Sequence, residues 1–252
     1  MNRTILITGA TSGIGQACAE DFAEAGDNVI IVGRRGERLA ELKTRIESLY
    51  KVKVLPLQLD VQKRKDVERA FQSLPQDWQN IDILVNNAGL ALGRDYFDEA
   101  NMDDWETMLN TNVHGLLYVT KAILPFMIPN KAGHIINIGS VAGKEIYEKG
   151  NVYCASKAAV DAISHSLRVD LLRHHIKVTA IHPGAVKTEF GTVRFKGDED
   201  TANKVYNGFT PLIPKDVAGV ILYCCNLPPN VCINDLVLTC TRQADAIYFN
   251  KS

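Results

Sequence analysis

Short apolar runs alternate with longer amphipathic runs along almost the whole chain, and this alternation constrains the fold more than any other feature. Strands that are nearly continuous in apolar residues and separated by helices indicate a parallel sheet covered on both faces. We therefore predict an α/β fold of the Rossmann type, a doubly wound parallel sheet. Predicted strands are 3–8, 28–33, 52–59, 81–85, 134–139, 177–181 and 235–239, and predicted helices are 16–23, 37–50, 64–73, 103–127, 152–174 and 214–227.

The chain length limits how many such units are present. With 252 residues, 46% of them hydrophobic, the chain can bury a substantial core of the size typical of one α/β domain. The sequence contains no internal repeat, low-complexity tract or linker that would divide it. We expect one catalytic domain over residues 1–252.

A glycine-rich turn joins the first predicted strand to the first predicted helix. It reads Thr8-Gly-Ala-Thr-Ser-Gly-Ile-Gly15, a spacing that differs from the common G-x-G-x-x-G fingerprint. Bare backbone amides and the positive end of a helix dipole would bind a phosphate there. No Lys-Ser or Lys-Thr pair follows the last glycine, so this is not a nucleoside triphosphate loop. A tight turn that needs glycine only for its positive φ is the alternative.

Two arginines follow the second predicted strand. Arg34 and Arg35 stand where a carboxylate would bond the ribose 2′-hydroxyl of NAD. Guanidiniums at that place suit a 2′-phosphate, because each presents a planar fork of donors. The sequence therefore favours NADP over NAD, although solvated charge at the start of a helix is the simpler alternative.

Tyr153 and Lys157 stand four residues apart in a predicted helix. This spacing places phenol and ammonium on one face, where a cation favours phenolate over phenol. Lowering a tyrosine pKa by about three units takes about 4 kcal/mol. We expect the charge of Lys157 to supply part of this stabilisation of the phenolate, so that Tyr153 acts as a base. Taken alone, the pair is more typical of an ordinary surface helix.

These motifs occur together with Asn86-Asn-Ala-Gly89, Asn112, Ser140 and Pro183-Gly184. In this order and spacing the sequence resembles the short-chain dehydrogenase/reductase family over nearly its whole length. The resemblance implies a catalytic tetrad of Asn112, Ser140, Tyr153 and Lys157, with Asn112 anchoring a water. It implies cofactor contacts from Gly9, Thr11, Ser12, Gly13, Ile14, Gly15, Arg34, Arg35, Asp60, Val61, Asn87, Tyr153, Lys157, Pro183, Gly184, Val186 and Thr188, and it requires no metal.

Closer matches lie in the runs 86–93, 104–108, 134–140 and 193–198. They resemble NADP-dependent 3-hydroxy acid dehydrogenases, which oxidise serine, allo-threonine and related acids and reduce malonic semialdehyde. The resemblance implies hydride transfer between NADP and a small 3-hydroxy acid or its semialdehyde. Two alternatives stay open: a carbonyl reductase for a steroid, sugar or acyl thioester, and a non-catalytic NADP-sensing protein, whose usual mark is a lost tyrosine or lysine.

The segment 190–210 is polar, charged and weakly periodic, and we expect a mobile substrate lid over about 188–212. A 3-hydroxy acid carries a carboxylate, which a guanidinium can grip bidentately. Arg194 on this lid is therefore a candidate substrate residue beside Ser140 and Tyr153. Lys144, Lys149 and Lys196 lie in comparably placed loops and are the competing cations.

Charge and composition exclude several partners. Lys plus Arg total 28 and Asp plus Glu total 29, for a net charge of −1, so no global field recruits nucleic acid or membrane. No signal segment precedes the first strand, and we expect a cytoplasmic protein. Six cysteines without a C-x-x-C pair favour reduced packing residues. The family resemblance implies a homodimer or homotetramer through helices 103–127 and 152–174, whose surplus apolar residues are Leu116, Leu117, Val119, Ile163, Leu167 and Leu171.

Overall fold

A seven-stranded parallel sheet forms the centre of the protein, seen here in a computed structural model that describes residues 2–251. The strand order β3-β2-β1-β4-β5-β6-β7 reverses direction between β1 and β4, as in a doubly wound sheet. The predicted fold class is confirmed. The strands are β1 (Thr4–Thr8), β2 (Asn28–Gly33), β3 (Val54–Gln58), β4 (Ile83–Asn86), β5 (Gly133–Ile138), β6 (Ile176–Pro183) and β7 (Asp235–Leu238).

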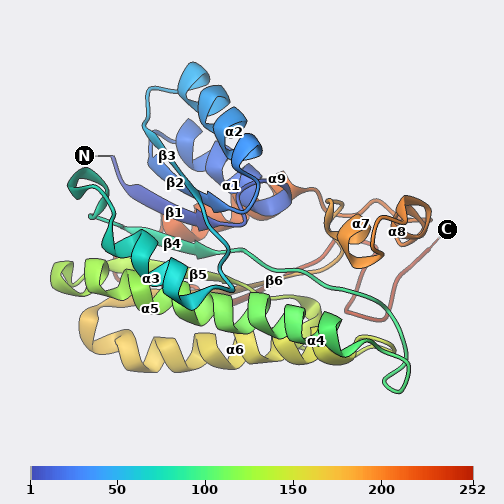
Figure 1. The fold of residues 1–252 in the computed structure, drawn as a ribbon. Helices are drawn as coiled ribbons and strands as arrows, with labels where there is room; N and C mark the ends of the chain where they lie inside the picture. The colour runs from blue at the N-terminus through green and yellow to red at the C-terminus, as the bar shows by residue number, and fades with distance from the viewer. Residues whose placement is uncertain (1, 252) are drawn as a thin grey trace.

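Helices cover both faces of the sheet (Figure 1). On one face lie α1 (Gly13–Glu24), α2 (Gly36–Leu49) and α9 (Pro214–Cys225), and on the other α3 (Arg64–Gln72), α5 (Leu116–Met127) and α6 (Asn151–Leu171). The remaining helices are α4 (Met102–Leu109), α7 (Phe190–Arg194) and α8 (Glu199–Lys204). Short 3₁₀ turns are η1 (Gln76–Trp78), η3 (Ile128–Asn130), η4 (Val141–Gly143) and η5 (Leu172–His174). No helix within residues 2–251 combines the length and apolar character needed to cross a bilayer.

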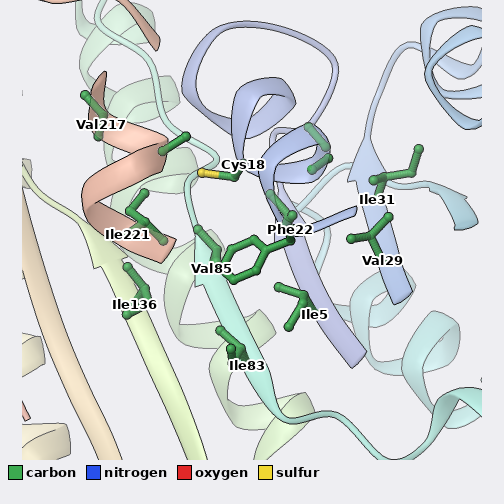
Figure 2. Packing of buried hydrophobic residues seen from close by; sticks show 14 of the residues in the cluster. Ile5, Cys18, Phe22, Val29, Ile31, Ile83, Val85, Ile136, Val217 and Ile221 are labelled. Carbon is green, nitrogen blue, oxygen red and sulfur yellow. The ribbon is translucent and has the colours of Figure 1, made fainter. Parts of the chain in front are cut away.

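Two hydrophobic clusters separate the helix layers from the sheet. Figure 2 shows Phe22 of α1 beside Ile5 and Val85 of the central strands, and Ile221 of α9 beside Ile136. All five side chains are at most 3% exposed, and burying each contributes about 1.5–3 kcal/mol. This packing fixes the sheet, and with it the ends of the strands from which the site is built.

The predicted helix 103–127 is not one α-helix. The structure places α4, a π-helical segment η2 (Asn110–Gly115) and α5 in direct succession. A π-helical insertion re-aims the side chains around it and frequently marks a functional site. Amphipathic periodicity could not reveal it, because the apolar pattern continues on both sides.

The predicted lid is also more ordered than its composition indicated. It contains α7 and α8, and the Asp198 carboxylate caps α8 by accepting a hydrogen bond from the Thr201 amide at 3.0 Å. These helices have only five and six residues, too few turns to produce a clear hydrophobic period.

Part of the expected surplus of apolar residues on α5 and α6 is core. Leu116, Val119 and Leu171 are buried, so they are not available for an interface. Leu117 is 39% exposed, and Val169 and Leu172 at the end of α6 are 75% and 73% exposed. Of the six residues expected to form surplus apolar surface, three are buried, Ile163 and Leu167 are half-buried and only Leu117 is exposed.

Candidate active site

A cavity of about 1160 Å³ lies at the carboxyl ends of the strands. Ligands of doubly wound sheets bind at this edge, near the point where the strand order reverses. Its wall includes every catalytic, cofactor and substrate residue expected from the sequence except Gly15 and Asn112. Segments far apart in the chain thus meet around one space, whose volume is large enough for a dinucleotide and a small substrate.

The glycine-rich turn lies at one end of this cavity. Gly9 and Gly13 have φ angles of +67° and +54°, a region that favours glycine. A Cβ atom at Gly13 would lie 3.2 Å from the Thr188 side chain, and one at Gly15 would collide with Asn87 and the Gly9 carbonyl. Gly9 and Gly13 shape the wall, whereas Gly15 allows α1 to begin close behind it. The missing side chains leave a cradle that fits a pyrophosphate.

Arg35 spans the glycine-rich turn. Its guanidinium donates to Thr11 Oγ1 at 2.9 Å and Ser12 Oγ at 2.9 Å, and it pairs with Glu189 at 2.8 Å. Arg38 contacts the same carboxylate at 2.6 Å. Hydrogen bonds from Arg35 and then Arg38 lower the pKa of Glu189 against the opposing effect of burial. The turn, the start of α2 and the start of the lid are therefore joined by one charged cluster, with exposed Arg34 beside it at the cavity wall.

Asn87 and Asp60 hold the loops after β4 and β3. The Asn87 amide donates to the carbonyls of Thr8 and Gly9 at 2.9 and 3.2 Å, which ties the end of β4 to the glycine-rich turn. The Asp60 carboxylate accepts from the Gln62 amide at 3.1 Å. Asp60 and Asn87 line the cavity together with Val61, as expected.

Ser140, Tyr153 and Lys157 converge on the cavity from two elements. Ser140 follows β5, and its Oγ accepts a hydrogen bond from the Ala142 amide at 3.1 Å. Tyr153 and Lys157 lie one turn apart on α6 and are 8% and 6% exposed. The Lys157 ammonium donates to the Ile138 carbonyl at 2.9 Å. The structure thus places the serine, the tyrosine and the lysine at one wall.

The electrostatics of Tyr153 correct one expectation. Burial raises the pKa of Tyr153, while a hydrogen bond with Ser140 and the charge of Arg194 oppose that rise only in part. Burial also lowers the pKa of Lys157 to about 8. In the cofactor-free protein, burial therefore outweighs the groups that favour the phenolate, and the pKa of Tyr153 is raised where the sequence-based expectation was that it is lowered.

Asn112 lies behind the wall, in the π-helical segment. Its amide donates to the Leu90 carbonyl at 2.8 Å and Ser156 Oγ at 3.0 Å, and its oxygen accepts from the Leu90 amide at 2.8 Å. A Cβ atom at Gly89 would lie 3.2 Å from the Asn112 oxygen and 3.5 Å from Lys157 Nζ. The three hydrogen bonds fix the loop after β4 against α6.

Arg194 is the lid cation that reaches the cavity. Its guanidinium donates to the Tyr147 hydroxyl at 2.9 Å and the Gly93 carbonyl at 3.2 Å, and its Cζ lies 5.5 Å from the Tyr153 ring centroid. The competing lysines are engaged elsewhere: Lys144 pairs with Asp161 and Asp235, Lys196 pairs with Asp104, and Lys149 lies over the Tyr96 ring.

Several wall residues were not expected from the sequence. Phe190 lies 5.7 Å from Tyr153 between ring centroids, and Gln243 from the C-terminal segment accepts from the Ala185 amide at 2.8 Å. Tyr147 and Glu189 complete the group. None belongs to a recognisable motif, and Gln243 is brought in only by the packing of the last residues, so no local signal could have identified them.

Together, this sheet, the glycine-rich turn and the serine, tyrosine and lysine at one wall define a dehydrogenase of the Rossmann type. The chain belongs to the short-chain dehydrogenase family, because the sequence model of the protein family described as short chain dehydrogenase matches residues 3–199. It is 48% identical over 244 residues to the NADP-dependent 3-hydroxy acid dehydrogenase of Escherichia coli (strain K12), covering 96% of each chain. It is 44% identical to sulfoacetaldehyde reductase 2 of Chromohalobacter salexigens, covering 97% of this chain and 96% of that one.

A solved structure agrees with these sequence matches. The closed form of serine dehydrogenase complexed with NADP⁺ superposes with a TM-score of 0.92 at 46% identity, covering 96% of this chain and 97% of that chain.

Proposed function

We propose that this protein is an NADP-dependent oxidoreductase that transfers a hydride between nicotinamide and a small 3-hydroxy acid, or its semialdehyde or ketone. One observation carries the substrate class: Arg194 and Tyr153 line the same cavity, with the guanidinium carbon 5.5 Å from the tyrosine ring centroid. An acid-base group and an anion-binding group on the wall of one cavity suit a molecule whose carboxylate lies a few bonds from its reacting carbon.

Four side chains have different roles in the proposed proton transfer. Bound NADP(H) supplies or accepts the hydride, and in its oxidised form it adds a positive charge to the cavity. Tyr153 takes the alcohol proton during oxidation and returns it during reduction, while Ser140 hydrogen-bonds the same substrate oxygen and orients it. Lys157, protonated below its pKa of about 8, provides the cation beside the phenolate. Asn112 keeps the loop behind Lys157 in place through its bonds to Leu90 and Ser156.

The cofactor preference rests on the arginines after β2. Arg34 and Arg35 line the cavity next to the glycine-rich turn, and a 2′-phosphate would bring the negative charge that they can bind. The relatives named for NADP and the NADP⁺-bound serine dehydrogenase support this choice. NAD, which lacks the phosphate, would gain nothing from these guanidiniums.

The rest of the proposed cofactor site lies along the same wall. The pyrophosphate would be held by the glycine-rich turn, that is by Gly9, Thr11, Ser12, Gly13 and Ile14, with Gly15 behind them. The adenosine would be held by Asp60, Val61 and Asn87, and the nicotinamide by Pro183, Gly184, Val186 and Thr188. The lid, about residues 188–212, would close over the nicotinamide and the substrate.

A carbonyl reductase for a neutral ketone or aldehyde is the second candidate. The tetrad is common to both functions, so the substrate anion decides between them. We would follow NADPH absorbance with serine, allo-threonine, 3-hydroxyisobutyrate, malonic semialdehyde and neutral alcohols, with NAD(H) in parallel. The proposal expects the highest kcat/KM for the acids with NADP(H). Higher kcat/KM for neutral alcohols or carbonyls would favour the second candidate, and no turnover of any compound would leave only an NADP-sensing role.

We also propose a cytoplasmic homotetramer or homodimer. Exposed apolar side chains on α5, on α6 and at the start of η5 support burial against a second copy; they are Leu117, Val169 and Leu172. Sedimentation velocity at micromolar concentration is expected to show a dimer or tetramer. A monomer would contradict this part of the proposal.

A further inference from the structure

Ser140 and the 3₁₀ turn η4 that follows it are called the Ser140 turn below. A group of charged and polar side chains lies next to this turn but outside the cavity. The Lys144 ammonium contacts both oxygens of Asp161 at 3.0 Å and one oxygen of Asp235 at 2.7 Å. All three side chains are at most 32% exposed. We call Lys144, Asp161, Asp235 and His182 the Lys144 cluster.

The Lys144 cluster joins elements that each carry part of the site. Lys144 directly follows η4, the turn that begins after Ser140, and Asp161 lies on α6 one turn beyond Lys157 and two beyond Tyr153. Asp235 begins β7, at the edge of the sheet. The ammonium therefore ties the turn that carries Ser140 to the helix that carries Tyr153.

Within the cluster, His182 lies between the three charged side chains and Ser140. It is fully buried, and its Nε2 lies 3.4 Å from a carboxylate oxygen of both Asp161 and Asp235. A Cβ atom at Gly139, the residue before Ser140, would collide with this ring. Burial and then the charge of Lys144 lower the pKa of His182, which favours the neutral imidazole. Lys144 contacts both carboxylates more closely than the exposed His165, which lies 3.6 Å from Asp161 and 3.9 Å from Asp235.

The turn itself is held by few bonds. The Ala142 amide donates to Ser140 Oγ at 3.1 Å, and the Gly143 amide donates to the Ser140 carbonyl at 2.9 Å. The Lys144 and Glu145 amides both donate to the Val141 carbonyl. All these bonds are local, and they define the shape of the turn. Its position relative to α6 depends on the close packing of Gly143 against the Lys157 backbone, on the bond from the Lys157 ammonium to the Ile138 carbonyl, and on the ion pairs of Lys144.

We propose that Lys144 is a positioning residue for Ser140, whose ion pairs with Asp161 and Asp235 hold the Ser140 turn against α6. The inference rests on the proposed function, because the position of Ser140 relative to Tyr153 affects catalysis only if both side chains act on the substrate. Lys144 does not touch the cavity, and it acts through the placement of the turn.

The test compares Lys144→Met with Lys149→Met, a lysine five residues later in the same loop that lies outside the cluster. Lys144→Met is expected to lower kcat about tenfold while KM for NADPH changes less than twofold, and Lys144→Arg is expected to restore most of kcat. Asp235→Asn removes one ion pair and is expected to give a smaller loss. An unchanged kcat in Lys144→Met, or an equal loss in Lys149→Met, would overturn the inference.

A second measurement does not depend on activity. Hydrogen exchange of the Ala142 and Gly143 amides in the cofactor-free protein, followed by NMR, is expected to accelerate at least fivefold in Lys144→Met and to stay unchanged in Lys149→Met. Unchanged exchange in Lys144→Met would overturn the positioning role. If the wild type proves inactive on every substrate while this exchange difference appears, the proposed function fails but the link between Lys144 and the turn stands.

Discussion

Arg34 and Arg35 are the side chains on which the cofactor preference depends. Replacing both with Gln is expected to raise the NADPH dissociation constant about 10–100-fold, because charge-assisted bonds to a phosphate contribute about 1.5–3 kcal/mol. The NADH dissociation constant should change less than threefold. Isothermal titration with both cofactors measures this, with Arg45→Gln as a control on α2. Equal losses for NADH and NADPH would show that the arginines serve only the shape of the turn.

Arg194 is the side chain on which the substrate class depends. Arg194→Met is expected to raise KM for hydroxy acids about 10–100-fold, the loss of a bidentate carboxylate contact, and to leave KM for neutral alcohols within threefold. Lys196→Met, which removes a neighbouring lid cation paired with Asp104, is the matched control. Steady-state kinetics that show the same rise for acids and neutral alcohols would exclude Arg194 as the carboxylate anchor.

Single residues also show where sequence reasoning ends. The motifs placed Ser140, Tyr153, Lys157 and the glycine-rich turn at the cavity, because each motif has a fixed relation to a strand end or a helix face. They could not give the Tyr153 pKa, which burial raises, since desolvation depends on what the rest of the chain packs around the ring. Gln243 and Glu189 became wall residues only through tertiary packing.

At the scale of elements, two ion pairs hold the start of the lid: Glu189 pairs with Arg35 and with Arg38. Glu189→Gln is expected to accelerate hydrogen exchange of the amides of α7 and α8 by about two- to fivefold, because partly exposed ion pairs each contribute at most about 1 kcal/mol. Mass spectrometry of lid peptides measures the effect, and Glu199→Gln in the first turn of α8 is the control. Unchanged exchange would mean that contacts such as Arg194 with Gly93 alone hold the lid.

The elements themselves were largely predictable. Every predicted strand is present with ends that differ by at most two residues, because buried parallel strands leave unbroken apolar runs. The π-helical segment and the two short lid helices were missed. The π-helical segment depends on a local change in the backbone hydrogen-bond pattern, and the lid helices depend on tertiary packing. Neither leaves a periodic pattern of apolar residues in the sequence.

At the scale of the whole molecule, His134 links folding to pH. It lies on β5, is 3% exposed, and donates or accepts one bond with Thr179 at 2.7 Å. Burial first, then the charges of Lys177 and Arg3, lower its pKa to about 3. In the unfolded chain His134 takes up a proton below about pH 6.5, whereas in the folded protein it does not, so stability falls as the pH falls from 6.5 toward 3.

This linkage predicts that His134 alone makes the fold about 2 kcal/mol less stable at pH 5 than at pH 7. Urea unfolding of wild type and His134→Gln at both pH values measures the difference. The variant is expected to be less stable overall but to lose about 2 kcal/mol less between the two pH values. An identical pH dependence in both proteins would mean that His134 is not buried in its neutral form.

The proposed enzyme depends most directly on the Tyr153 hydroxyl as its proton donor and acceptor. Tyr153→Phe removes only that oxygen from a ring that is packed against Phe190. Stopped-flow measurement of NADPH oxidation with malonic semialdehyde, beside titration of NADPH binding, tests it. We predict a rate about 10²–10⁴-fold lower with an unchanged NADPH dissociation constant. A Tyr153→Phe rate within tenfold of wild type would contradict the account.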